Sequence, residues 1–483
     1  MHTSLDVCRV FRPDYVPPSA ASGLDFSRFD AYRGEAREAQ PFAGISARRI
    51  NSGEAFFQDA VRAIRDGELV IPNPFGAGTL ATREVLVCPS IPWATVPLYV
   101  ARFAGPEPFY FVKRGLSWCT DLGLVFPQRR LFVSFQQEDR RMTQDIADIE
   151  HAFVWFDRHG DDVANAPPRS PCPLAPCLIV TSDHFAHHIW NELSVVEGLV
   201  AEDLHREVTL LVNRQPLAPI STLFPEIPAK LIEIVHGPPD EPMRVAMRRG
   251  LLVAPAGRTY VPPALVDRLR RVARAMHPQA ATDAATFRAR HDFVLWISVR
   301  LEARTATNLV EVLAYALIAL QERHPAMGVV FDGFTRPAGA PTGWNQALID
   351  AERRAVAETL ARTGLRVDHV ALSGCTTTEA FLWAEVADYY VCPYGSAQHK
   401  VAWINPVPGL VHAGQNKQPV ASMDAGFYVR QQGAAPQFFF AAVTRRDLAD
   451  DARQDLFSYC LDPEAFTATL VADIAARAMS GAR

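Results

Sequence analysis

From residue 178 onward, the chain alternates short apolar runs with longer segments of helical periodicity. The predicted strands lie at residues 178–180, 208–212, 231–235, 250–253, 293–298, 328–332, 367–371, 389–392 and 407–411, most of them apolar throughout. The last is a weaker candidate, because Pro408-Gly409 interrupts it. Runs this short, with little polar alternation, are typical of strands that are buried on both faces of a parallel sheet. Strands that alternate with helices form sheets covered by those helices. The pattern therefore restricts this part of the chain to an α/β architecture.

The alternation falls into two series, which predicts two domains. A helix at residues 264–276 and a polar hinge at 277–286 separate the run that ends at 253 from the run that begins at 293. A chain of 483 residues is long enough for two large domains. We therefore predict two successive doubly wound α/β domains, at residues 76–280 and 281–483, with an N-terminal extension at residues 1–75. A final amphipathic helix is predicted at residues 463–479.

The first third of the chain shows a weaker pattern. Residues 1–75 are rich in Pro, Gly, Ser and Ala, and within them only residues 54–66 have helical periodicity, with Gly67 as the expected stop. Short β-type runs follow at residues 84–88, 98–100, 109–112 and 131–135. These runs predict strands, but their order in a sheet does not follow from the pattern.

The amino-acid composition argues against some classes of partner and location. Lys and Arg number 48 against 53 Asp and Glu, for a formal net charge of −5, so the sequence indicates no nucleic-acid partner. No uncharged apolar window of about 18 residues predicts a membrane span, and the N-terminus lacks the basic and apolar regions of a secretory signal. With only eight cysteines, these features predict a cytoplasmic location. Only four of the cations are lysines, namely Lys113, Lys230, Lys400 and Lys417.

Ligands of doubly wound sheets bind beyond the carboxyl ends of the strands, so the loops that follow the strands are the candidate sites. The loop and helix start at residues 181–192 hold three histidines, His184, His187 and His188, together with Asp183 and Glu192. An imidazole can accept a hydroxyl proton at neutral pH, and a neighbouring carboxylate can orient its ring. The same side chains could instead bind a metal or simply begin the helix.

The loop at residues 298–308 places two arginines, Arg300 and Arg304, between the end of a strand and the start of a helix near Asn308. Guanidinium groups form bidentate hydrogen bonds to phosphates, and a helix N-terminus supplies oriented N–H groups. The loop therefore predicts a diphosphate site. The alternative is a solvated loop in which Asn308 caps the helix.

The loop at residues 393–400 contains Tyr394, Gly395, Ser396 and Lys400. Gly395 would let the backbone approach a ligand closely, Ser396 offers a hydroxyl, and Lys400 offers a positive charge for a leaving phosphate. An ordinary turn has a similar composition. The loops Asp332-Gly333 and Ser373-Gly374-Cys375 also follow strands, but they are more typical of turns.

These three loops, in this order, resemble the family-61 glycosyltransferases over about residues 178–415. The resemblance rests on His187-His188 with Asn191 and Glu192, on Ile297-Ser298 with Arg300, Arg304, Asn308 and Glu311, and on Ala387-Asp388 followed by Tyr394-Gly395-Ser396-Ala397. Tyr394 stands where the family has a histidine, and Ala397 stands where the family has a second glycine. The chain has no Asp-x-Asp motif beside an apolar strand.

The resemblance implies a GT-B arrangement, in which two Rossmann-like domains face each other across a cleft, with inversion at the sugar carbon and no metal requirement. Residues 76–280 would then bind the acceptor, a glycan or a protein. Residues 281–483 would bind a nucleotide-sugar donor as co-substrate, without a further cofactor, and the helix at 463–479 would cross back to the first domain.

We therefore hypothesise a glycosyltransferase with His188, or His187, as general base and Asp183 or Glu192 as the group that orients it. The predicted donor-binding residues are Arg300, Arg304, Asn308, Tyr394, Gly395, Ser396 and Lys400. Two alternatives stay open: a metal-dependent hydrolase that uses the cluster at residues 184–192, and a non-catalytic binding protein with a GT-B-like fold. The sequence indicates neither the donor sugar nor the oligomeric state.

Overall fold

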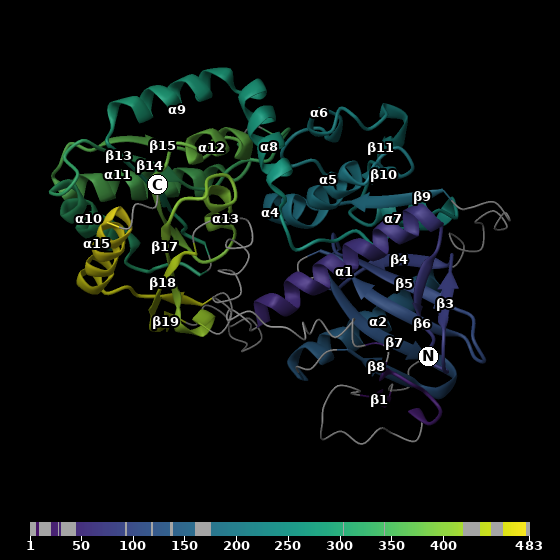
Figure 1. The fold of residues 1–483 in the computed structure, drawn as a ribbon. Coiled ribbons are helices and arrows are strands. Elements are labelled where there is room, and N and C mark those ends of the chain that lie inside the picture. Colours follow the sequence, from purple (N-terminus) through teal and green to yellow (C-terminus); the bar gives the residue numbers. More distant parts are fainter. Residues whose placement is uncertain are drawn as a thin grey trace. The chain divides into compact units, whose positions relative to one another are not determined.

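The computed structural model describes residues 6–8, 21–27, 29, 45–91, 94–116, 119–135, 139–159, 175–302, 304–341, 343–418, 435–445 and 457–479. The chain forms two compact units, Met1–Pro262 and Pro263–Arg483, named here unit 1 and unit 2. Figure 1 shows the helices and strands of both. Both units contain a parallel sheet with helices, so the predicted mixed α/β class is confirmed.

Unit 1 begins with a sheet that is largely antiparallel. Its described strands are β1 (Asp6–Cys8), β4 (Val85–Pro89), β5 (Pro97–Phe103), β6 (Phe109–Arg114), β7 (Thr120–Phe126) and β8 (Leu131–Ser134). Their order is β1-β8-β7-β6-β5-β4, and β1 alone among them runs parallel to its neighbour. The predicted β-type runs therefore pair with one another, a result that the local pattern could not reveal.

Helices and a short hairpin complete this part of unit 1. They are α1 (Ile45–Asp66), the hairpin of β2 (Leu69–Pro72) and β3 (Thr79–Thr82), the short helix η3 (Pro127–Arg129) and α2 (Asp139–Arg158). Helix α1 ends before Gly67, whose φ of +71° confirms the predicted stop.

The predicted N-terminal extension at residues 1–75 differs from the structure in its second half. Phe56, Phe57, Val61 and Ile64 of α1 are buried, and α1 packs against β7 of the antiparallel sheet. The apolar stripe of this helix therefore belongs to the core of unit 1. Residues 1–5, 9–20, 28 and 30–44 lie outside the described residues.

The second sheet of unit 1 is parallel throughout its described strands. It consists of β9 (Pro176–Val180), β10 (Thr209–Val212), β11 (Ile232–Ile234) and β12 (Leu252–Val253), in the order β11-β10-β9-β12. Its helical segments are α4 (Phe185–His187), η4 (His188–Leu193), α5 (Ser194–Ala201), α6 (Ile220–Leu223), η5 (Ala229–Leu231) and α7 (Glu241–Arg248). The first strand, β9, lies between β10 and β12, so the strand order reverses at β9.

Unit 2 contains a parallel sheet of six described strands, in the order β15-β14-β13-β16-β17-β18. The strands are β13 (Phe293–Ser298), β14 (Met327–Asp332), β15 (Asp368–Ala371), β16 (Tyr389–Pro393), β17 (Gly409–Gly414) and β18 (Gln437–Ala441). A small antiparallel pair follows, β19 (Val443–Arg445) with β20 (Ser458–Tyr459). The strand order reverses at β13, and the predicted strands of this series are confirmed.

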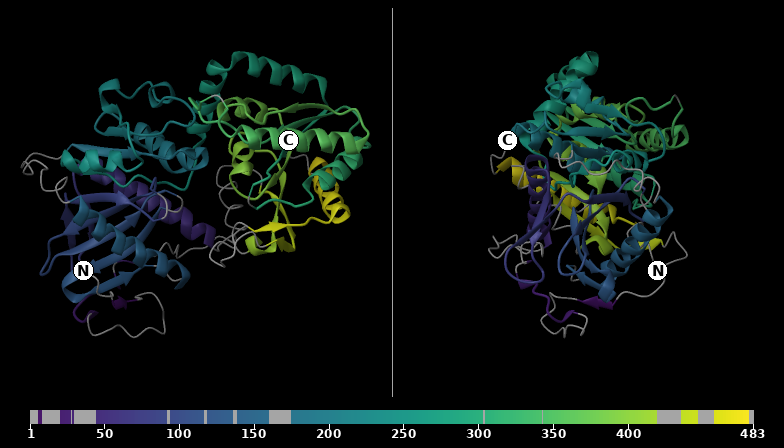
Figure 2. Two further views of the ribbon diagram at one scale, coloured as in Figure 1. Left: turned by 180° about the vertical axis from the view of Figure 1, so that it is seen from behind. Right: turned by 90° about the vertical axis from the view of Figure 1, so that its right-hand side faces the viewer.

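The helices of unit 2 form two packed groups. One group contains α10 (Leu309–Gln321), α11 (Gln346–Thr363) and α15 (Pro463–Met479), and the other contains α8 (Pro263–Met276), α9 (Pro278–Arg290), α12 (Thr377–Ala384) and α13 (Ser396–Ala402). In Figure 2, seen from behind, α11 lies on the near side of the sheet. Two groups of this kind are what a doubly wound sheet requires.

The division between the units differs from the predicted boundary at 280/281. The structure divides the chain at Pro262 and Pro263, and residues predicted as a hinge form helix α9 instead. Pro278 opens this helix, where a proline costs no hydrogen bond. Ala284 and Phe287 of α9 are buried, and α9 packs against α12. Both α8 and α9 therefore belong to unit 2.

The final helix, α15, begins and ends as predicted. Phe466, Leu470 and Ile474 are buried in the same apolar core as Leu313 and Leu317 of α10. The apolar face of α15 is therefore used within unit 2.

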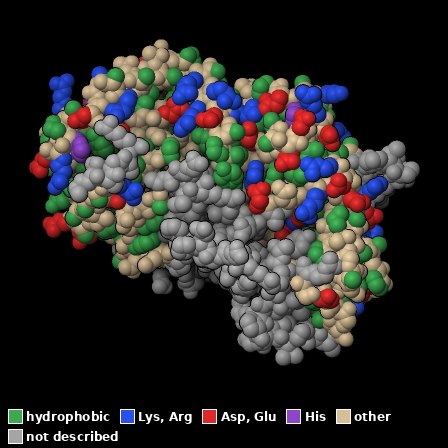
Figure 3. Space-filling model, in the orientation of Figure 1, with side chains coloured by type: hydrophobic (Ala, Val, Ile, Leu, Met, Phe, Trp, Pro, Cys, Tyr) green, Lys and Arg blue, Asp and Glu red, His purple; other side chains and the backbone are tan. Residues whose placement is uncertain are grey.

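The surface of the described residues carries mixed charge. On the face drawn in Figure 3, basic and acidic side chains are interspersed. None of the described helices is long and apolar enough to cross a bilayer.

Candidate functional site

A buried histidine and a buried glutamate meet at the carboxyl end of β9. His188 Nδ1 lies 2.7 Å from Glu192 Oε2, and the two residues are 0% and 2% exposed. The other carboxylate oxygen of Glu192 accepts the backbone N–H groups of Thr181 at 2.8 Å and Ser182 at 3.0 Å. Glu192 therefore fixes the end of the strand and the ring of His188 at the same time.

The tautomer of His188 follows from this contact. A carboxylate accepts hydrogen bonds, so the Nδ1–H of His188 donates to Glu192, and in the neutral ring the lone pair is then on Nε2. His188 Nε2 is buried and has no hydrogen-bond partner within the described part of the chain. A carboxylate-oriented imidazole with a free Nε2 is the arrangement of a general base. Of the two predicted orienting groups, Glu192 makes the contact, and Asp183 is exposed.

The backbone that carries this pair is unusual. Residues His188–Leu193 form a π-helical turn between α4 and α5. Such turns are rare and occur frequently at functional sites, because they redirect side chains within an otherwise regular helix. The turn buries His188, Asn191 and Glu192, which a sequence read at α-helical spacing would only place on one face.

The other predicted members of the cluster have different surroundings. His187 Nδ1 lies 3.1 Å from Asn191 Oδ1, and Asn191 Nδ2 donates to the Arg258 carbonyl at 2.8 Å. Burial lowers the pKa of His187, which keeps this ring neutral. His184 is exposed. In the part of the chain that the structure describes, no group of three His, Cys, Asp or Glu side chains is arranged to hold a metal ion.

Two arginines converge on one turn at the carboxyl edge of the unit 2 sheet. A Cβ placed on Gly395 would lie 3.3 Å from Arg304 Nη1 and 3.6 Å from Arg300 Nη1. Arg300 follows β13 and Gly395 follows β16, and these strands are neighbours at the point where the strand order reverses. The structure therefore brings together three of the predicted donor-binding residues, Arg300, Arg304 and Gly395. They lie at the position where doubly wound sheets bind ligands.

At this turn, Arg300 and Arg304 form no ion pair with a described carboxylate. Burial, together with the charge of Arg304, lowers the pKa of Arg300 to about 10, so it still carries its charge at neutral pH. Arg304 has a φ of +58°, a region that costs a non-glycine residue free energy. Its Nε is buried without a hydrogen-bond partner. An anion bound at this turn would relieve both the repulsion and the unmet hydrogen bond.

Other groups of unit 2 contact two further predicted donor-binding residues, Lys400 and Asn308. Lys400 Nζ lies 2.6 Å from Asp332 Oδ1 and donates to the Gly333 carbonyl at 2.7 Å, and the lysine is only 4% exposed. The Asn308 side chain bonds both backbone groups of Leu461, at 2.8 and 3.1 Å. Both residues therefore fix the edge of the sheet around the arginines.

Tyr394 and Ser396 flank the glycine of the same turn. The Tyr394 N–H donates to the His412 carbonyl at 2.9 Å, and Lys417 Nζ lies 5.8 Å from the centre of the Tyr394 ring. Ser396 is the first residue of α13. Both side chains are partly exposed, so they are accessible to a ligand at this turn.

Sequence reasoning missed a buried carboxyl group beside these residues. Glu352 lies on α11 and is 3% exposed. Its Oε2 accepts the Phe334 N–H at 2.6 Å and the Ser373 hydroxyl at 3.0 Å. Burial raises the pKa of Glu352 to about 7. The loops at Asp332-Gly333 and Ser373-Gly374 were the available signal, since both lead to this carboxyl group, whereas nothing in the helix pattern marks Glu352.

Unit 1 also contains two buried charge networks away from His188. Lys113 is fully buried, and its Nζ lies 2.6 Å from Asp59 Oδ2 and 2.5 Å from Asp121 Oδ1. One lysine thus faces two carboxylates, and burial raises the pKa of Asp121 to about 6.

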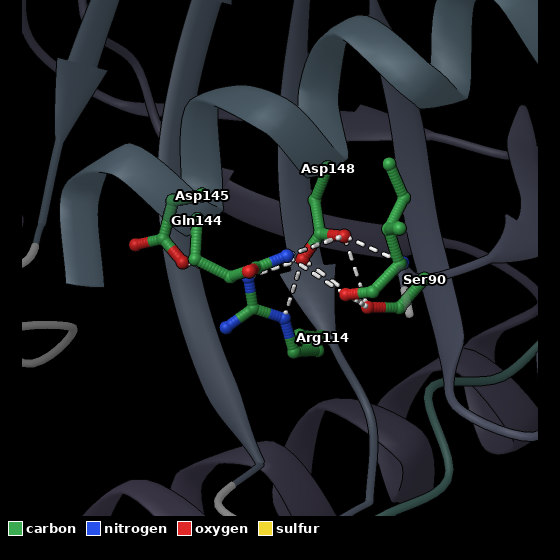
Figure 4. A network of polar contacts seen from close by, with 6 residues as sticks. Ser90, Arg114, Gln144, Asp145 and Asp148 are labelled. Carbon is green, nitrogen blue, oxygen red and sulfur yellow. Dashed lines mark hydrogen bonds and ion pairs between the residues drawn. The ribbon is translucent and has the colours of Figure 1, made fainter. Parts of the chain in front are cut away.

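The second network, shown in Figure 4, surrounds Asp148 of α2. The Ser90 hydroxyl at 3.0 Å, the Ile91 N–H at 2.7 Å and Arg114 Nε at 2.9 Å all donate to its carboxylate. Arg114 also pairs with Asp145 at 2.7 Å. These bonds join α2 to the ends of β4 and β6, and we assign them to the stability of unit 1.

Comparisons with known proteins give only weak similarities. No protein-family model matches it, and no curated protein sequence matches it. Solved structures that resemble it include an α,α-trehalose-phosphate synthase (UDP-forming) of Burkholderia vietnamiensis, at 10% identity and a TM-score of 0.28, over 62% of this chain and 72% of that one. Another is a protein of Listeria monocytogenes assigned as a UDP-N-acetylglucosamine 2-epimerase, at 12% identity and a TM-score of 0.25, over 58% of this chain and 65% of that one.

Proposed function

We propose that the chain transfers a glycosyl group from a nucleotide sugar to a hydroxyl of a glycan or protein acceptor, with inversion and without a metal ion. In this proposal, Arg300, Arg304 and the turn at Gly395 bind the diphosphate of the donor. His188, oriented by Glu192, takes the proton of the acceptor hydroxyl. The protein would act in the cytoplasm.

The observation that carries the proposal is the pair of guanidinium groups at Gly395. Neither Arg300 nor Arg304 forms an ion pair with a described carboxylate, and Gly395 leaves space beside both. A diphosphate matches this arrangement because its oxygens accept bidentate hydrogen bonds from guanidinium groups. The left-handed conformation of Arg304 supports the same interpretation, since backbone strain is retained mainly where it serves a function.

The proposed reaction needs only groups that the chain supplies. The acceptor oxygen forms a bond to the anomeric carbon as the bond from that carbon to the diphosphate oxygen breaks. The hydroxyl proton passes to His188 Nε2, and the electron pair of the broken bond remains on the diphosphate. Fixed cations stabilise that developing charge, an effect worth about 10²–10³ in rate for one such group.

Arg304→Gly tests the donor site without the usual risk of unfolding. The substitution removes the guanidinium and also relieves the φ of +58°. We expect unit 2 to keep its stability while the affinity for nucleoside diphosphates falls by about tenfold or more, because charge-assisted hydrogen bonds contribute roughly 1.5–3 kcal/mol. Calorimetry with UDP, GDP and their sugar derivatives measures this loss.

Arg362→Ala is the matched control for this experiment. Arg362 lies on α11, is exposed and pairs with Glu358, so its removal should leave the affinity unchanged. A wild-type protein that binds no member of the panel, or an Arg304→Gly variant that binds as tightly as wild type, contradicts the proposal.

A non-catalytic nucleotide-sugar-binding protein is the second candidate, and the burial of His188 Nε2 favours it. If no acceptor hydroxyl reached Nε2, the histidine would take no substrate proton. Incubation of the bound donor with acceptor hydroxyls separates the two candidates, because a binding protein holds the donor without consuming it.

A further inference from the structure

Glu352 is a buried carboxyl group that the proposed reaction does not use. Its Oε2 is held in one place by the Phe334 N–H at 2.6 Å and the Ser373 hydroxyl at 3.0 Å. A Cβ on Gly333 would lie only 2.2 Å from Oε2, so the glycine is what allows the carboxyl group to reach the backbone of this loop. The orientation of Glu352 is therefore set by the carboxyl ends of β14 and β15.

The other carboxylate oxygen of Glu352 has different surroundings. Among the described residues, Glu352 Oε1 makes no hydrogen bond, and no lysine or arginine forms an ion pair with Glu352. The positive charge of Lys400 favours ionisation of Glu352. However, Lys400 is paired with Asp332, whose negative charge opposes that ionisation. Oε1 is therefore the free oxygen of a buried carboxyl group that has no ion-pair partner among the described residues.

The nearby arginines do not neutralise Glu352 either. Arg353 Nη2 donates to the Ser373 carbonyl at 2.8 Å, and Arg336 Nε donates to the Gly374 carbonyl at 2.6 Å. Burial, with a smaller contribution from Asp332, raises the pKa of Glu352 to about 7. Because Oε2 already accepts two hydrogen bonds, the proton of the neutral form resides on Oε1, where it can be donated.

The loop that contacts Glu352 is also joined to the turn of the proposed diphosphate site. Lys400 of α13 donates to the Gly333 carbonyl at 2.7 Å, and Gly395 directly precedes that helix. An ionised carboxylate there would repel a bound anion, whereas a protonated one donates a strong hydrogen bond to it. We infer that Glu352 binds the donor in its protonated form, with Oε1–H donating to an anionic phosphate oxygen of the ligand. This inference rests on the proposed function.

The test is the pH dependence of pyrophosphate binding to wild type and Glu352→Gln, measured by calorimetry. Glutamine retains an oxygen for Phe334 and Ser373 and a neutral donor in place of Oε1–H, but it does not titrate. Pyrophosphate titrates in the same range, so the ratio of the two dissociation constants at each pH is the quantity to follow. We expect the ratio to be near one at about pH 6 and wild type to bind about tenfold more weakly at about pH 8.5.

Glu358→Gln is the control, because Glu358 lies on the same helix but is exposed, and it should show the wild-type pH profile. A ratio that stays constant with pH overturns the role of Glu352. If that flat ratio occurs while Arg304→Gly still abolishes binding, the inference fails and the proposed function stands. If wild type binds no pyrophosphate at any pH, both fail.

Discussion

The loops after β9 and after β13 occupy the same place in two parallel sheets, yet they carry opposite chemistry. Each follows the first strand of its sheet, at the point where the strand order reverses. After β9, the Glu192 carboxylate is satisfied by two N–H groups and by His188. After β13, Arg300 and Arg304 lie beside each other without a carboxylate partner among the residues that the structure describes.

This difference separates what topology decides from what side chains decide. A reversal of strand order opens a position at the edge of a sheet, but it does not specify what binds there. In unit 1 the position holds a carboxylate whose oxygens already accept hydrogen bonds from the backbone and from His188. In unit 2 it holds excess positive charge that an anion would balance.

His188→Gln should have the largest effect on the rate. Glutamine cannot accept and release the acceptor proton, so we expect transfer to slow by about 10²–10⁴, the usual contribution of a general base. Donor affinity should stay unchanged, in contrast to Arg304→Gly. Turnover of the calorimetrically selected donor measures the effect, with His184→Gln as an exposed control. Full activity of His188→Gln would show that His188 is not the general base.

Removal of the buried lysines should cost the most stability. Lys113→Met leaves two buried carboxylates and Lys400→Met leaves one, and breaking a buried ion pair typically costs about 3–5 kcal/mol. We expect the loss of unfolding free energy in urea to be larger for Lys113→Met. Lys230→Met, at an exposed position, should change it by less than about 0.5 kcal/mol. Equal values for all three variants would contradict this account.

Asp121 should make unit 1 less stable as the pH rises. Burial raises its pKa from 3.8 to about 6, so the folded state holds this proton more tightly than the unfolded state. The stabilisation is complete below about pH 4 and is lost as the pH passes through 6, by up to about 3 kcal/mol. Urea midpoints across this range measure the loss. Asp121→Asn should flatten the profile there, and an unchanged profile would refute the assignment.

Gly395→Ala should weaken diphosphate binding by about tenfold, the smallest of these effects. Gly395 has a φ of +121°, and an added Cβ would lie 3.3 Å from Arg304 Nη1, so both strain and crowding act on the site. Gly339 is the matched control, because its φ is +73° but no atom lies within 4 Å of an added Cβ. Gly339→Ala should therefore lose a little stability and no affinity, and calorimetry distinguishes the two glycines.

Much of the parallel architecture could be predicted because it depends on local pattern. Short uniformly apolar runs mark strands buried on both faces, and the loops that follow them mark the candidate sites. Arg300, Arg304 and Gly395 were found in this way, and so was the pairing of His188 with Glu192 as one of several options. The antiparallel sheet of unit 1 was not found, since its pairing joins runs that give no local signal of their partners.

The alternation of strands and helices, the positions of the loops, and the kinds of side chain in them follow from the amino-acid sequence. Which of those side chains are already paired depends on how the chain packs. Lys400 and Arg304 both follow strands in the sequence, but Lys400 is neutralised by Asp332, whereas Arg304 has no described carboxylate partner. The reason is that charge balance depends on neighbours brought together by packing, and Asp332 is 68 residues away from Lys400 along the chain.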